Sequence, residues 1–190
     1  MFNIRILSAA FAVVLALAPA RAGEITDAGK AAEQAVTDGD YEAAFESINT
    51  ARDSIWEHSP LVLRNVNFTA GEPTGYGIYE IRPNNEFKSG EAIVIYTEPR
   101  GYGFGEEGDF YVMDMGLDYE VTDVTGKSLA KQENFDSWTL RSRYPNKEFM
   151  GKLNYDFSGL SPGDYKVITT VRDRNSDKLN SFSMSFKLLP

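Results

Sequence analysis

Polar and apolar residues alternate one by one through much of the second half of the chain. Near the C-terminus Phe182, Met184, Phe186 and Leu188 are separated by serines and a lysine. In an extended chain this period of two places the apolar side chains on one face of a strand. The predicted core-facing positions of four such strands are Leu117, Tyr119 and Val121; Phe149, Leu153, Tyr155 and Phe157; Tyr165, Val167, Thr169 and Val171; and Phe182, Met184, Phe186 and Leu188.

Two further strands complete the predicted sheets. The run AIVIYTE, residues 92–98, is apolar at successive positions, which is typical of a strand covered on both faces. A first strand is predicted at Tyr76–Ile81, and Asp123 to Lys127 with Gly126 predicts a hairpin turn. About seven short strands with turn residues between them favour a mainly β fold, a two-sheet antiparallel sandwich.

Residues 24–57 have the spacing of helices instead. Thr26 or Asp27 is a suitable cap for a helix that ends near Thr37, and Asp38-Gly39-Asp40 interrupts the pattern. Asp40 then caps a second helix from Tyr41 to about Glu57. Its apolar stripe consists of Tyr41, Ala44, Phe45, Ile48, Ala51, Ile55 and Trp56. The stripe either packs on the following domain or forms an independent docking surface.

Two stretches resemble known families. GDYEAAFESINTA is similar to the junction and second helix of a tetratricopeptide repeat at Gly39, Asp40, Tyr41, Ala44 and Ala51, with Pro60 further on. It occurs once, whereas a solenoid needs about three repeats, so a single N-terminal α-helical hairpin is expected. GLSPGDYKVITTV resembles the corner before a late strand of immunoglobulin-like and fibronectin III-like sandwiches. That resemblance implies a Tyr165 hydroxyl bonded to nearby backbone, and Val167 stands where antibody domains have a cysteine.

The first 22 residues have the pattern of a secretory signal peptide. Arg5 precedes an apolar run from Ile6 to Leu17, and Ala20-Arg21-Ala22 predicts cleavage before Gly23. The predicted organisation is therefore a signal peptide over 1–22, a helical hairpin over 23–60, a linker over 61–75 and an immunoglobulin-like sandwich over 76–190.

Composition narrows the compartment and the partners. The chain contains no cysteine and has a formal net charge of −9. An exported protein without disulfides is typical of a bacterial periplasm. An acidic chain without a basic stretch argues against a nucleic-acid partner or stable membrane insertion.

Residues 103–108, GFGEEG, match a dinucleotide-binding pattern by spacing alone. That site needs a helix after the glycines, whereas the sequence that follows predicts a strand. The lone His58 favours a helix-end partner over a general base. Residues 173–177 start like a calcium loop, but Lys178 and Met184 replace the required Gly and Glu, which favours a hairpin turn. We predict no catalytic, metal or cofactor site, and no pair of carboxylates stands out for sugar hydrolysis.

The predicted partner-binding residues are Tyr102, Phe104, Trp138 and Arg143. The glycine-rich loop EPRGYGFGEEG is expected to expose Tyr102 and Phe104, and its acids are expected to attract Arg141, Arg143 and Lys147. Trp138 belongs to a turn-rich stretch, 135–147, that serves either as an interface or as core. The resulting prediction is a periplasmic, non-enzymatic binding or adaptor protein with an envelope protein partner or a glycan and no nucleic-acid partner. A carbohydrate-binding module or an envelope hydrolase are the alternatives, and the oligomeric state stays open.

Overall fold

The computed structural model describes residues 22–190, and its fold is mainly β with an N-terminal helical hairpin, as predicted. The chain divides into two compact units, up to Ala51 and from Arg52 to Pro190. Apart from Ala22, the predicted signal peptide lies outside the described residues. Within those residues no helix is both long and apolar enough to cross a membrane.

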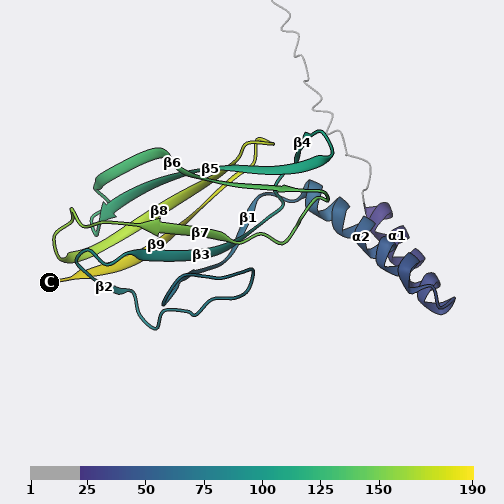
Figure 1. The fold of residues 1–190 in the computed structure, drawn as a ribbon, viewed down its shortest axis with the longest axis horizontal. Coiled ribbons are helices and arrows are strands. Elements are labelled where there is room, and N and C mark those ends of the chain that lie inside the picture. The colour runs from purple at the N-terminus through teal and green to yellow at the C-terminus, as the bar shows by residue number, and fades with distance from the viewer. Residues whose placement is uncertain (1–21) are drawn as a thin grey trace, which may run out of the picture. The chain divides into compact units, whose positions relative to one another are not determined.

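The hairpin consists of α1, Ala22–Thr37, and α2, Tyr41–His58, which lie side by side (Figure 1). The predicted cap of α2 is confirmed, because the amide of Ala43 donates to Asp40 Oδ1 at 3.0 Å. Helix α1 begins before its predicted cap at Thr26 or Asp27. Gly23 and Glu24 take up its first turn, where a carboxylate suits the helix dipole.

The hairpin buries two small side chains and leaves large apolar side chains exposed. Ala32 and Ala44 are buried, whereas Tyr41, Phe45 and Ile48 of the α2 stripe are 63%, 68% and 53% exposed. The two predicted roles of this stripe stay predictions.

The second unit contains two sheets, and the strand axes of the two sheets are roughly aligned (Figure 1). The smaller sheet has the order β1-β3-β7, with β1 at Val62–Phe68, β3 at Ile93–Arg100 and β7 at Gly151–Tyr155. The larger sheet has the order β2-β9-β8-β5-β4, with β6 paired to β5. Its strands are β2, Glu86–Lys88; β4, Gly105–Glu107; β5, Phe110–Asp123; β6, Ser128–Ser142; β8, Gly163–Asp173; and β9, Leu179–Leu189. All pairs are antiparallel except β2 with β9, which is parallel.

Apolar side chains from both sheets form one core, which makes the unit a sandwich. Strand β3 is buried on both faces from Ile93 to Pro99, as its continuous apolar pattern predicts. In β9 the alternation is also confirmed: Phe186 and Leu188 are buried and the serines between the apolar positions are exposed.

Two predicted elements near the start of the sandwich are wrong. Tyr76–Ile81 forms no strand, because this stretch has few pairing partners and contributes only to the isolated bridges Thr69–Ile81 and Gly75–Ile78. The predicted linker 61–75 instead contains β1, which pairs with β3. The asparagines of β1 obscure the alternation of apolar and polar residues in its sequence. Asn65, with φ of 53°, also interrupts the register of its pairing with β3.

Two local predictions are confirmed. A strand, β5, follows GFGEEG in place of the helix that a pyrophosphate site needs. The Tyr165 hydroxyl donates to the carbonyl oxygen of Ser161 at 2.7 Å, so the tyrosine closes its own corner.

Candidate functional site

The glycine-rich loop after β3 turns inward. Tyr102 is 1% exposed, and its hydroxyl donates to the carbonyl oxygen of Asn146 at 2.7 Å. Gly101 makes the turn possible, because its φ is +77° and a Cβ there would lie 2.5 Å from the carbonyl oxygen of Pro60. Burial raises the pKa of the Tyr102 phenol. The expectation that this loop exposes Tyr102 is therefore wrong.

The last turns of α2 cover the same loop. The indole of Trp56 donates to the carbonyl oxygen of Tyr102 at 2.8 Å, and the two rings meet edge to face with centroids 4.9 Å apart. Phe104 packs edge to face on Tyr102 at 5.3 Å and stays half-buried. Three aromatic side chains thus fix the loop to the helix.

Trp138 is also part of the core. It lies within β6, not in a turn, and is 7% exposed. Its indole donates to the carbonyl oxygen of Lys152 at 3.0 Å, and its ring covers Gly151, where a Cβ would overlap the ring. Of the two predicted alternatives for Trp138, interface or core, the structure shows the core. The partner-binding role of Tyr102, Phe104, Trp138 and Arg143 stays a prediction.

Three cations at the end of β6 and just after it, Arg141, Arg143 and Lys147, contact other parts of the second unit. Arg141 and Arg143 stack on the ring of Phe110, at 3.4 and 4.8 Å from its centroid. Arg141 also pairs with Glu107 at 3.6 Å, so the predicted attraction to the glycine-rich loop holds for Arg141. Lys147 pairs instead with Asp53 at 2.7 Å.

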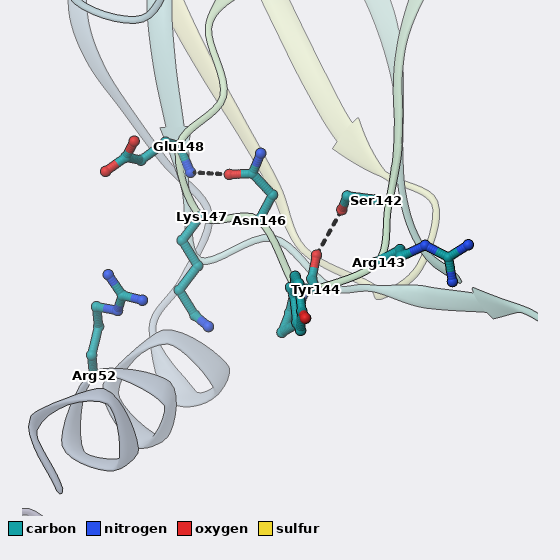
Figure 2. A pocket seen from close by; sticks show the side chains of 8 residues that line it. Arg52, Ser142, Arg143, Tyr144, Asn146, Lys147 and Glu148 are labelled. Carbon is teal, nitrogen blue, oxygen red and sulfur yellow. Dashed lines mark hydrogen bonds between the residues drawn. The ribbon is translucent and has the colours of Figure 1, made fainter. Parts of the chain in front are cut away.

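A cavity of about 310 Å³ opens where the loop after β6 meets α2, and we call it the loop cavity. Figure 2 shows Arg52 and Arg143 on opposite sides, with Lys147 and Tyr144 between them. Three cations face a single carboxylate in its lining, which consists of Arg52, Ser142, Arg143, Tyr144, Pro145, Asn146, Lys147 and Glu148.

Hydrogen bonds fix the conformation of this loop. The Ser142 hydroxyl donates to the carbonyl oxygen of Tyr144 at 2.6 Å, and the Glu148 amide donates to Asn146 Oδ1 at 2.8 Å (Figure 2). The Tyr102 hydroxyl holds the carbonyl of Asn146 from the core side. Tyr144 itself is 80% exposed. The loop therefore presents one aromatic ring on a preformed backbone.

The charges that line the loop cavity differ in their partners. Lys147 is neutralised by Asp53, and its side chain is only 8% exposed. Among residues 22–190, the side chains of Arg52 and Arg143 have neither an ion pair nor a hydrogen bond, and Arg143 stacks on the Phe110 ring. The cavity thus carries two guanidinium groups without a carboxylate partner in the described part of the chain.

A second cavity of about 490 Å³ adjoins the first, and we call it the aromatic cavity. It shares Pro145 and Lys147 with the loop cavity. Its remaining lining consists of Asp53, Trp56, Glu57, Tyr102, Gly103, Phe104, Asn175, Ser176 and Lys178.

Other candidate groups are occupied by local contacts. His58 Nδ1 lies 2.7 Å from the carbonyl oxygen of Ser54, as expected for a partner of the helix end. Asp173 is buried in the β8–β9 turn, accepts from the amides of Gly103 and Asn175, and contacts the Ser176 hydroxyl. In the described range no cluster of three or more His, Cys, Asp or Glu is placed to hold a metal ion.

Sequence reasoning found Arg143 and Lys147 but missed Arg52. One feature of the sequence distinguishes Arg52 from its surroundings: Lys30 and Arg52 are the only cations among residues 24–57. Nothing in the sequence brings Arg52 to the loop after β6, because that contact depends on how α2 joins the sandwich.

Similarity to known proteins is found among solved structures. No family model matches the chain, and no curated protein matches it. A solved structure of the Pseudomonas fluorescens alkylpurine DNA glycosylase AlkC, bound to DNA containing an abasic site analog, matches 79% of this chain and 39% of that chain. The TM-score is 0.37 and the sequence identity is 12%.

This finding corrects the predicted function and partners. The matching structure is described as an enzyme bound to DNA, whereas the predicted function is a non-enzymatic periplasmic adaptor without a nucleic-acid partner. We withdraw that prediction together with its glycan-binding and hydrolase alternatives. A likeness at this level transfers no activity to the chain, so the function below is derived from the cavities alone.

Proposed function

We propose that residues 52–190 form a domain that binds a small organic anion in the loop cavity. The observation that carries the proposal is the pair Arg52 and Arg143, which line one cavity without a carboxylate partner among the described residues. In a chain with a formal net charge of −9, such an excess of positive charge is a local exception.

Guanidinium groups suit this role. Each offers planar donors that match the two oxygens of a carboxylate or phosphate, and such charge-assisted bonds are stronger than neutral ones. Stacking on Phe110 holds the Arg143 guanidinium near its ring before any ligand arrives. Arg52 stands on a helix, so its backbone is equally fixed. Both donors are therefore partly preorganised, which lowers the entropic cost of binding.

Binding fits the cavity better than catalysis does. The Ser142 hydroxyl, which lines the cavity, donates to a backbone carbonyl, and among the described residues no imidazole or carboxylate is hydrogen-bonded to it. A nucleophilic hydroxyl needs an adjacent base for activation. We therefore propose binding, and not catalysis, as the role of the loop cavity. The sequence pattern of residues 1–22 adds export with cleavage before Gly23 to the proposal.

The test is calorimetric titration with three anionic probes: inorganic phosphate, succinate and a short single-stranded oligonucleotide. Arg52→Gln and Arg143→Gln should each weaken binding about tenfold, equivalent to about 1.4 kcal/mol. Affinity should also fall as salt rises, because the arginines are exposed and their charges are screened over about 10 Å at 0.1 M. The probe that binds most tightly shows whether the anionic oxygens of the ligand belong to a phosphate, a carboxylate or a nucleic acid.

The matched control is Arg64→Gln, which removes an exposed arginine of β1 that lines neither cavity. It lowers the net charge equally and should leave each affinity unchanged. Equal weakening by all three substitutions would reduce the effect to the overall charge, and the proposed site would be wrong.

A further inference from the structure

The loop cavity and the aromatic cavity are neighbours. They share Pro145 and Lys147, and successive residues of α2 line them, Arg52 in the first and Asp53 in the second. The Lys147 ammonium stands between them, 5.9 Å from the centroid of the Trp56 ring. A ligand held at the loop cavity therefore lies beside the aromatic cavity, on the other side of Pro145.

The two lysines of the aromatic cavity already have partners. Lys147 pairs with Asp53 at 2.7 Å. The Lys178 ammonium donates to the backbone carbonyls of Glu57 at 2.9 Å and Gly101 at 2.7 Å. Its lining contains two lysines and two carboxylates, so it carries no excess charge. A charged ligand group gains little here.

The apolar side chains that line the aromatic cavity are only partly covered by other residues. Trp56 and Phe104 stay half-buried, although both pack edge to face on the fully buried Tyr102. Aromatic rings prefer edge-to-face or offset neighbours with centroids 4.5–7 Å apart. A flat ring entering the aromatic cavity would gain such contacts from both side chains.

We propose that the ligand is an aromatic anion. Its anionic group binds at Arg52 and Arg143, and its ring extends past Pro145 to pack against Trp56 and Phe104. This inference rests on the proposed function, because the loop cavity supplies the anionic end.

The test compares two probes that share one anionic group, methyl phosphate and phenyl phosphate. The wild-type protein should bind phenyl phosphate at least tenfold more tightly. In Phe104→Ser that preference should disappear, while the affinity for methyl phosphate stays the same. Ile78→Ser is the matched control, because it removes an exposed apolar side chain outside both cavities and should leave the preference intact.

A spectroscopic measurement on the unaltered protein accompanies the variants. The chain has two tryptophans, and each indole N–H donates to a backbone carbonyl, Trp56 to Tyr102 and Trp138 to Lys152. Phenyl phosphate should shift the indole resonance of Trp56 and leave that of Trp138 in place. Methyl phosphate should shift neither.

The outcomes separate this inference from the proposed function. Equal affinity for both probes, or a preference that survives in Phe104→Ser without a Trp56 shift, overturns the aromatic ligand and leaves anion binding standing. If neither probe binds the wild-type protein, the aromatic ligand is overturned, and the proposed function is overturned with it when inorganic phosphate, succinate and the oligonucleotide also fail to bind.

Discussion

Replacing Gly101 with alanine tests whether the loop that carries Tyr102 is held as the structure shows. Gly101 has a φ of +77°, a conformation that L residues rarely adopt. A Cβ at this position would also lie 2.5 Å from the carbonyl oxygen of Pro60 and still closer to the Ser59 hydroxyl. The Pro60 oxygen belongs to the backbone, so it cannot move aside as the end of a flexible side chain would.

The two effects add to a large loss of stability. The positive φ costs alanine about 1–2 kcal/mol. Overpacking against a backbone atom costs about 1–3 kcal/mol more. Gly101→Ala should therefore lower the free energy of unfolding by about 2–5 kcal/mol. For a domain of this size each kcal/mol corresponds to about 2–4 °C, which predicts a fall of about 10 °C in Tm.

Gly126→Ala is the matched control in the same unit. Gly126 also has a positive φ, +85°, but a Cβ there would meet nothing within 4 Å. It should lower Tm by only a few degrees, since only the cost of the backbone conformation remains. Thermal unfolding followed by near-UV circular dichroism measures both variants. Equal shifts would show that the close approach of Gly101 to Pro60 is not present, and the buried position of Tyr102 would fall with it.

Three further predictions concern other parts of the chain. Tyr165→Phe removes the hydroxyl that donates to Ser161 and should lower the urea midpoint by an amount equivalent to about 0.5–1.5 kcal/mol; an unchanged midpoint would refute the corner. The Arg172 guanidinium lowers the pKa of Asp118, so this pair stabilises the fold above the unfolded pKa of about 3.9 and loses that effect as pH falls through the folded pKa. Asp118→Asn should therefore reduce the urea midpoint at neutral pH but not well below pH 4, and a loss that is equal at both pH values would contradict this. Intact-mass analysis of the exported chain should show a product that begins at Gly23, and a product that retains residues 1–22 would contradict the predicted cleavage.

The sequence predicts those parts of the fold whose signals are local. The cap at Asp40 and the alternation through β9 need no information from distant residues, and both are confirmed. Strand β1 was missed because its register is interrupted at Asn65 and its pairing with β3 is a long-range property. The same reason explains why Tyr76–Ile81, which has suitable residues but few pairing partners, forms no strand.

The candidate site shows the same division between local and distant signals. The cations of the loop after β6 are visible in the sequence, and both Arg143 and Lys147 line the loop cavity. The burial of Tyr102 cannot be predicted from the sequence, because it depends on Trp56, which is 46 residues away. Glycine-rich composition indicates a turning backbone but does not decide whether the neighbouring side chain faces solvent or core.

The central claim is that Arg52 and Arg143 together bind an anion. The most direct measurement follows the side-chain Nε–H resonances of the arginines by NMR while phenyl phosphate is added to the full chain. The resonances of Arg52 and Arg143 should move along saturating curves with one shared dissociation constant, while that of Arg64 stays in place. Small, linear shifts of all three arginines, or no shift of Arg52, would contradict the claim.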